Sequence, residues 1–310
     1  MAAPDHLVLI RRLGVLVESI HAVVYFAPEP QAAYAGLGLK GYWRGYFASR
    51  AAPLGEAGPE LVTALFAGFA PAMVARALPA VWGTASPQQV QAARQDAATA
   101  ALRRLAHPAH LASVAAAAEL TGRCVQALRL PGRPMAAAQV ALPRPDEPLA
   151  VLWHDCTVLR EHRGDGHLAA VAVAGLVWPE PHLLPGRQVD AQQQQHRGWD
   201  DESWQRAADR VGQRAADRVG QRAADRVGQR AADRVGQRAA DRVGQRAADR
   251  VRSCTAAELD ATTDELAAPA YDVLTAAERV ELAGLLEPLA VAASAELPYP
   301  NAMGLLRLGD

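Results

Sequence analysis

Apolar positions recur at helical spacing along most of this chain. Between Leu7 and Ala27 they fall near i, i+3, i+4 and i+7, which predicts one amphipathic helix. Further periodic runs, several opened by a proline or a capping residue, predict helices over residues 30–37, 59–69, 71–82, 87–105, 109–130, 149–163, 167–176, 255–266 and 275–295. Few runs alternate as β-strands do, so the pattern predicts a mostly α protein with at most a small hairpin.

Three stretches interrupt this helical pattern. Residues 38–55 are aromatic and glycine-rich and too irregular for a long helix, and Gly164 and Gly166 separate two of the predicted helices. Residues 130–150 contain five prolines. We therefore expect an N-terminal helical domain over residues 1–130, a Pro-rich connection over 131–150 and a second domain over 151–310.

Residues 205–252 consist of six near-identical copies of the octapeptide QRAADRVG. Its residues are acceptable helix formers apart from the glycine, which costs roughly 1 kcal/mol relative to alanine. Eight residues advance a helix by about 800°, so the valines spiral around the axis and make no continuous apolar stripe. We expect a long solvated helix of about 72 Å inserted in the second domain, in preference to a partly disordered segment.

Charge is unevenly distributed between the repeats and the rest of the chain. The 13 Arg and 6 Asp of the repeats give this segment +7, although the whole chain has a formal net charge of −1. A basic segment of this kind can contact nucleic-acid phosphates. In-frame expansion of a short DNA repeat is the alternative, and the uniformity of the copies favours it.

The other bulk properties are those of a bacterial cytoplasmic protein. The three cysteines lie far apart in the sequence, which argues against a disulfide framework and for a reducing compartment. No window offers about 18 uninterrupted apolar residues, so we predict no membrane span.

A first candidate site combines aromatic and guanidinium groups of the N-terminal half. His21 and Tyr25 are spaced i, i+4 on the first helix and so project together. The glycine-rich segment and the helix after it add Trp43, Arg44, Tyr46, Arg50 and Arg76. Such groups, gathered between helices, predict a pocket for a planar or anionic small ligand. An aromatic core with structural arginines is the alternative.

A second candidate site is the densest polar cluster of the chain. It comprises His154, Arg160, Glu161, His162, Arg163, Asp165 and His167. The cluster is a candidate metal or general-base site, but its spacing matches no metal signature, so we assign no metal. A helix C-terminus with favourable cations is the alternative. The phosphate-binding loop, GxSxG, CxxC and HExxH motifs are absent, and no cofactor or catalytic residue is assigned.

Several segments outside the repeats carry a family resemblance. They are YWRGYFASRAAPLG (42–55), ALFAGFAPAMVARALPAVW (64–82), LREHRGDGHLAAV (159–171), RGWDDESW (197–204), LDATTDELAAPAYDVL (259–274) and LPYPN (297–301). Together they resemble an uncharacterised actinobacterial helix-turn-helix family with an N-terminal helical domain and a MarR-like winged-helix C-terminal half.

The resemblance implies roles for the C-terminal segments. Residues 167–176 would form the first helix of the helix-turn-helix, and Asp200 onward would form its recognition helix, with DNA contacts from Trp204, Arg206, Arg210 and Arg214. The final helix pair would form the arm of a homodimer. The family continues into a glycine-containing wing and an LTxxG segment, whereas RSCTAAELD follows the repeats here. We expect the repeats to replace the wing, which weakens the case for DNA binding.

Two function hypotheses follow from these features. The first is a ligand-responsive, winged-helix-like transcriptional regulator. The second is an enzyme or small-molecule binding protein that uses the N-terminal pocket together with the REHRGDGH segment, residues 160–167. Convergence of the two candidate sites on one closed cavity would favour the second hypothesis.

Overall fold

The regular structure of this protein is helical. A computed structural model describes residues 4–187, 191–232, 254–298, 301 and 307–308, and within these ranges every regular element is a helix and no strand occurs. The predicted mostly α fold is therefore confirmed. The described residues provide no strand for a wing, so the winged-helix character of the C-terminal half stays a prediction.

Proline residues open most helices of the N-terminal part. The helices are α1 (Pro4–His21), α2 (Val23–Phe26), α3 (Pro28–Gly36), α4 (Tyr42–Ala51), α5 (Pro59–Leu65), α6 (Pro71–Ala75), α7 (Pro87–Leu105) and α8 (Pro108–Gln126). The first predicted helix is thus divided after His21. The prediction that residues 38–55 are too irregular for a long helix is wrong for α4. This helix forms because it buries Tyr46, Phe47 and Ala51 in the core.

The C-terminal part contains α9 (Pro134–Val140), α10 (Pro148–Val173), the short 3-10 helix η3 (Glu180–Leu183), α11 (Ala191–His196), α12 (Asp201–Ala232), α14 (Ala256–Ala267) and α15 (Ala276–Ser294). Capping boxes at Thr255 and Thr275 fix the starts of α14 and α15, where the side-chain hydroxyl and the glutamate three residues later exchange hydrogen bonds with the backbone.

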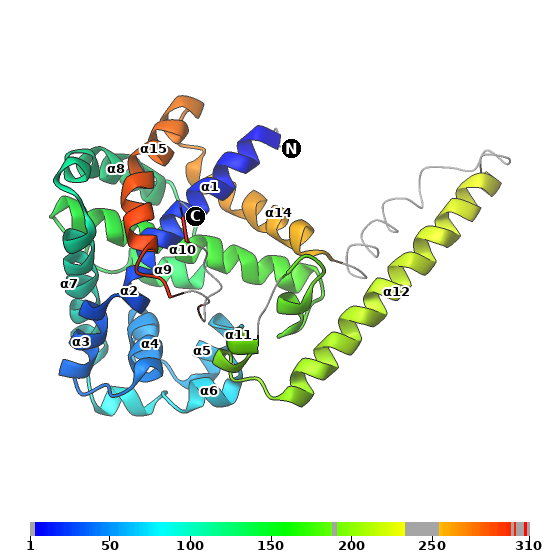
Figure 1. Ribbon diagram of the computed structural model, residues 1–310, viewed down its shortest axis with the longest axis horizontal. Helices are drawn as coiled ribbons and strands as arrows, with labels where there is room; N and C mark the ends of the chain where they lie inside the picture. Colours follow the sequence, from blue (N-terminus) through cyan, green and yellow to red (C-terminus); the bar gives the residue numbers. More distant parts are fainter. Residues whose placement is uncertain (1–3, 188–190, 233–253, 299–300, 302–306, 309–310) are drawn as a thin grey trace.

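Helix α10 lies at the centre of the molecule (Figure 1) and packs against α1, α7, α8, α9 and α14. It runs without a break through Gly164 and Gly166, so the two helices predicted over residues 149–163 and 167–176 are one. The physical reason is tertiary. The Arg133 guanidinium lies against Gly166 and donates to the carbonyl oxygens of His162 (2.7 Å) and Leu266 (2.8 Å), which holds this turn in place.

Residues from both predicted domains share one apolar core. Helix α1 packs against α10 and against α15, and the core includes Ile10, Leu152 and Leu286. A smaller cluster around Val171, Leu184 and Leu259 joins the end of α10 to η3 and α14. The division at residues 131–150 stays a prediction, and these contacts show that the two sides of it are packed together.

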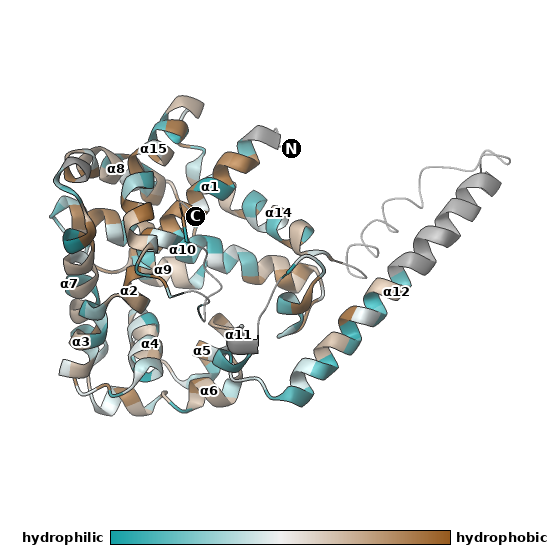
Figure 2. Ribbon diagram, viewed as in Figure 1, coloured by the Kyte–Doolittle hydropathy of each residue, from teal (hydrophilic) through white to brown (hydrophobic). Residues whose placement is uncertain are grey.

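Helix α12 leaves this body as a straight arm (Figure 1), and its described part is largely hydrophilic (Figure 2). The helix predicted over the repeats is present as far as Ala232, and residues 233–252 lie outside the described residues. Among the side chains of α12 whose burial is described, residues 201–217, the buried apolar ones are Trp204 and Ala207, in the first turns. Among the described helices, none combines the length and the apolar character needed to cross a membrane.

Candidate functional site

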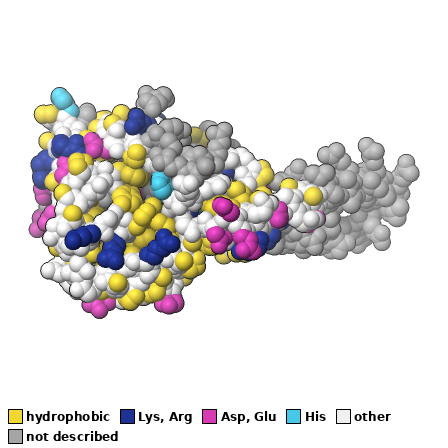
Figure 3. Space-filling view, turned by 60° about the horizontal axis from the view of Figure 1, so that its bottom comes forward, with side chains coloured by type: hydrophobic (Ala, Val, Ile, Leu, Met, Phe, Trp, Pro, Cys, Tyr) yellow, Lys and Arg dark blue, Asp and Glu magenta, His cyan; other side chains and the backbone are white. Residues whose placement is uncertain are grey.

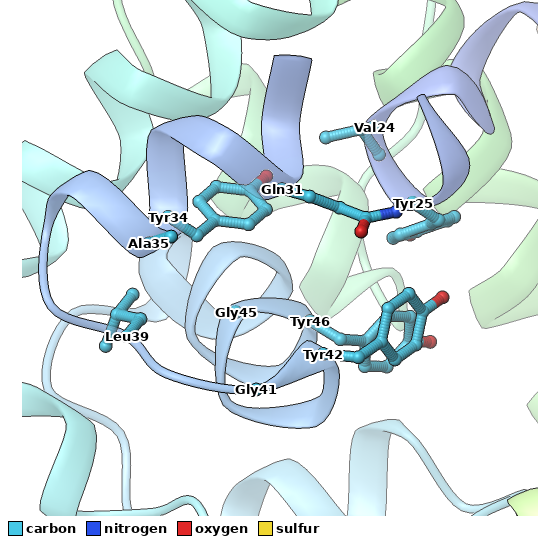
Figure 4. A pocket seen from close by; sticks show the side chains of 10 residues that line it. All are labelled: Val24, Tyr25, Gln31, Tyr34, Ala35, Leu39, Gly41, Tyr42, Gly45 and Tyr46. Atoms are coloured by element: carbon cyan, nitrogen blue, oxygen red, sulfur yellow. The ribbon is translucent and has the colours of Figure 1, made fainter. Parts of the chain in front are cut away.

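A pocket with a cavity volume of about 180 Å³ opens between α2, α3 and α4 (Figure 4). We call it the tyrosine pocket. Its lining residues are Val24, Tyr25, Gln31, Tyr34, Ala35, Leu39, Gly41, Tyr42, Gly45 and Tyr46. Figure 4 shows Tyr25, Tyr42 and Tyr46 gathered at one end and Tyr34 and Leu39 at the other, with Gln31 between them.

Local sequence explains the shape of this pocket. Tyr42 and Tyr46 are one helical turn apart on α4, and their rings stack with centroids 6.3 Å apart. Gly45 allows the ring of Tyr34 to lie against α4, because a Cβ at this position would be only 2.8 Å from Tyr34 Cδ2. The result is a flat-sided, aromatic cavity.

Behind Tyr25, a hydrogen-bond chain leads to α10. The single hydroxyl proton of Thr157 goes to the Trp153 carbonyl (2.9 Å), so His21 Nδ1 donates to Thr157 Oγ1 (3.0 Å). His21 Nε2 therefore accepts the Tyr25 hydroxyl proton (2.9 Å). Burial, together with Arg160, lowers the pKa of His21 well below its usual value, so this imidazole is neutral. Tyr25 keeps only lone pairs for any further partner.

Behind Tyr46, a buried ionic network also leads to α10. Arg50 donates to the Tyr46 hydroxyl (3.3 Å) and to both oxygens of Glu161 (3.3 and 3.2 Å). Arg160 bridges Glu161 (2.9 Å) and Glu18 (3.0 Å). Burial alone would raise the pKa of Glu161, but the Arg160 and Arg50 guanidiniums hold it well below its usual range. Glu161 is thus a structural carboxylate, with both oxygens engaged.

The structure brings together part of the first predicted site. Tyr25 and Tyr46 line the pocket, and His21 and Arg50 hold their hydroxyl groups from behind. Trp43 packs instead on Phe69, with ring centroids 5.6 Å apart. The remaining two residues, Arg44 and Arg76, are exposed and lie outside the lining. Sequence reasoning missed Tyr34 and Tyr42. The i, i+4 spacing of Tyr42 and Tyr46 in the sequence could have identified Tyr42.

The second predicted site is divided around α10. Arg160 and Glu161 belong to the ionic network behind the pocket, whereas Arg163 pairs with Asp264 (2.7 Å) and His167 bonds Thr263 (3.1 Å) on α14. Asp165 accepts the backbone N–H groups of Met135 (3.4 Å) and Ala136 (3.0 Å) at the start of α9.

The two remaining members of the second site are buried histidines. His154 is 5 % exposed and His162 is 3 % exposed. Within the described part of the chain, no three His, Cys, Asp or Glu residues lie together as metal ligands would. Among the described residues of the second site, Arg160 and Glu161 are therefore the only ones in the network that joins the first site.

The residues just before and within the first turns of the predicted recognition helix are docked on the body. Trp199 Nε1 donates to the Gly68 carbonyl (3.1 Å), and the Ala70 N–H donates to the Arg197 carbonyl (2.9 Å). Farther along, Arg214 donates to the carbonyl of Gly175 (2.8 Å), directly after α10. The start of α12 is thus attached to α5–α6 and to the end of α10.

A family model described as a helix-turn-helix family matches residues 10–300 of the chain. This protein belongs to the helix-turn-helix family. No curated protein and no solved structure matches the chain. The family part of the resemblance is thus confirmed, and at a coarse level membership indicates a DNA-binding regulator. The MarR-like half stays a proposal.

Two of the arginines predicted to contact DNA bind a carboxylate of the body here. Arg210 binds the fully buried carboxylate of Glu180 on η3, and Arg214 lies 3.5 Å from the same carboxylate. Arg206 pairs with the exposed Glu202, and Trp204 is buried. The other charged side chains described on α12 are Asp201, Asp209 and Asp217. Figure 3 shows acidic side chains gathered where the described part of α12 leaves the body.

Proposed function

We propose that this helix-turn-helix protein is a ligand-responsive regulator, in which the tyrosine pocket binds a planar small molecule and α10 connects the pocket to α12. One observation carries the proposal: the pocket is linked by hydrogen bonds to α10, and the first turns of α12 are bonded to the residues that follow α10. Tyr25 and Tyr46 reach α10 through His21 and Arg50, and Arg214 bonds the carbonyl of Gly175 just after α10.

The lining of the pocket favours a particular class of ligand. The stacked rings of Tyr42 and Tyr46 offer flat apolar faces to a planar ring. Tyr25 offers only lone pairs, because its proton is given to His21. The buried Tyr42 hydroxyl has no partner among the described residues. A planar molecule with one donor and one acceptor group would satisfy both hydroxyls.

A thermal-shift and calorimetric screen with phenols, aryl amides and neutral heteroaromatic compounds tests the pocket. Ala35→Phe at its lining should abolish any shift that the wild-type protein shows. Ala32→Phe is the matched control, because Ala32 is exposed on the same helix and lies outside the lining. A compound that stabilises both variants as well as the wild-type protein binds elsewhere and overturns this assignment.

Responsiveness needs a second measurement, on DNA. A duplex selected from a random-sequence pool should bind the wild-type protein, and the pocket ligand should change its affinity by 5-fold or more, roughly the lower bound of typical allosteric coupling. A ligand that binds the pocket and leaves DNA affinity unchanged would contradict the coupling through α10.

A second candidate function is a small-molecule binding protein that has lost DNA binding. The pairing of Arg210 and Arg214 with Glu180 and the other, mainly acidic charged side chains described on α12 favour it. It predicts ligand binding with no selected duplex. An enzyme is less favoured, because His21 and Glu161 are fully engaged in hydrogen bonds. The proposal also includes a cytoplasmic location. It further includes a homodimer through α14 and α15, and native mass spectrometry tests whether the protein is a dimer.

A further inference from the structure

Glu180 is a buried carboxylate whose partners come mainly from the repeats. It lies on η3, is 0 % exposed and accepts the Val177 N–H (3.2 Å). Arg210 belongs to the first octapeptide copy and Arg214 to the second, and both guanidiniums reach this one carboxylate. We call the three side chains the Glu180 clamp.

Helical geometry explains why two successive copies contribute to the clamp. The octapeptide places arginine at every fourth residue, so Arg210 and Arg214 are neighbours on one face of α12. Ala207, which is fully buried, lies on the same face one turn earlier. Arg206 lies outside the clamp and pairs with the exposed Glu202. The clamp therefore comprises Arg210 and Arg214 and excludes Arg206.

The clamp changes what α12 can offer to DNA. With Arg210 and Arg214 bound to Glu180, the other charged side chains described on α12 are four acids and Arg206. Acidic groups repel DNA phosphates, whereas each arginine–phosphate contact releases counterions and strengthens binding. By sequence, residues 218–252 add ten Arg and four Asp, so this part of the chain carries charge that attracts phosphates.

We infer that the Glu180 clamp is autoinhibitory: it holds Arg210 and Arg214 away from DNA, and tight binding requires their transfer from Glu180 to phosphates. This inference rests on the proposed DNA-binding function. Release is opposed, because it leaves a buried carboxylate without a cation. Removal of the charge at residue 180 removes this opposition.

Glu180→Gln tests the clamp, since it keeps a side-chain oxygen for the Val177 N–H and removes the negative charge. The affinity of the wild-type and variant proteins for a fluorescent random-sequence duplex is measured by anisotropy between 50 and 200 mM salt. The variant should bind more tightly, and its affinity should fall by a factor about ten times larger over this range than that of the wild-type protein, as expected for about two additional phosphate contacts.

Asp209→Asn is the matched control. It makes the same charge change on the exposed side of α12, where Asp209 bonds Gln205 and not an arginine of the clamp. It should leave the salt dependence as in the wild-type protein. Equal effects of the two substitutions on DNA affinity and its salt dependence would show a general effect of charge and would overturn the clamp.

Arg214→Gln provides a test in case Glu180→Gln does not fold, because it leaves the Arg210–Glu180 pair in place. On the random-sequence duplex the wild-type protein keeps Arg214 on Glu180 and away from phosphates, so this variant should bind that duplex as the wild-type protein does. A weaker, less salt-dependent Arg214→Gln protein would place Arg214 on DNA already and overturn the clamp.

The outcomes separate the inference from the proposed function. If the wild-type protein binds DNA and Glu180→Gln has the same salt dependence of affinity, the clamp is overturned, and the proposed DNA-binding function is not. Binding by the variant and not by the wild-type protein supports the clamp most strongly. A duplex pool from which neither protein selects anything overturns both.

Discussion

Burial determines the protonation of the histidines on α10. It lowers the pKa of His162 to about 4, with Arg133 contributing, and it lowers the pKa of His167 to about 4. A histidine in an unfolded chain has a pKa of about 6.5. The unfolded chain therefore binds more protons than the folded protein when the pH falls below 6.5. The histidines contribute stability above that pH and lose it progressively as the pH falls toward 4.

His162 should account for a defined part of this acid sensitivity. Between pH 7 and pH 5 its contribution to the free energy of unfolding should fall by about 2 kcal/mol. Urea unfolding at the two pH values measures this loss, and His162→Gln should reduce it by about that amount. Equal pH dependence in the wild-type and variant proteins would show that residue 162 is not held neutral by its surroundings.

At the scale of single helices, the two glycines of α10 differ in their surroundings. A Cβ on Gly164 would find its nearest neighbours at 3.7 and 3.8 Å, which is ordinary contact. A Cβ on Gly166 would collide with Arg133 Nη1 and lie 3.3 Å from Leu266 Cβ. That guanidinium cannot move freely, because it donates to the carbonyls of His162 and Leu266.

Alanine should therefore have opposite effects at these two positions. Gly164→Ala should raise the free energy of unfolding by up to about 1 kcal/mol, through helix propensity alone. Gly166→Ala should lower it by about 1 kcal/mol, because the loss of the Arg133 hydrogen bonds exceeds the gain in propensity. Each glycine serves as the control for the other in chemical denaturation. Stabilisation by both would show that Arg133 does not hold this turn.

Helix starts could be predicted from the sequence, whereas the continuity of α10 could not. Helix starts at Ser86, Thr255 and Thr275 were predictable, because a cap and the first turn form within four residues. The continuity of α10 was not, because Arg133, which stabilises the helix beside Gly166, lies 29 positions before its partner His162 and 133 positions before its other partner, Leu266.

The candidate site divides in the same way. The i, i+4 pair of His21 and Tyr25 was visible in the sequence, and the structure joins it by a hydrogen bond. Tyr34 reaches the pocket only because α3 packs against α4 at Gly45, which no local pattern reveals. Likewise, the arginines of α12 were identifiable, but their partner Glu180 was not, because η3 and α12 meet through tertiary packing.

On the scale of the whole molecule, a packed body carries one long arm. The contacts that hold the described part of α12 to the body lie between Trp204 and Arg214. They involve the first octapeptide copy and the start of the second. Later copies repeat the sequence, but each successive copy is rotated by about 80° around the helix. Identical copies on one helix thus face different directions, and among the described residues it is the first and second copies that meet Glu180.

Shortening the array should therefore have an effect that depends on which copies remain. A variant that lacks residues 221–252 keeps Trp204, Ala207, Arg210 and Arg214, and its free energy of unfolding should stay within about 0.5 kcal/mol of the wild-type value. A variant that lacks residues 205–252 loses both arginines, and the carboxylate of Glu180 loses its two guanidinium partners and the helix that packs on it.

The second variant should be less stable by about 2 kcal/mol, below the cost of breaking a fully buried pair because Arg210 is partly exposed. Urea unfolding followed by circular dichroism compares the three proteins. If the first variant loses as much as the second, contacts beyond the second copy stabilise the body. If neither loses stability, then Glu180 does not need the repeats, and the cost of uncovering it is too small to restrain Arg210 and Arg214.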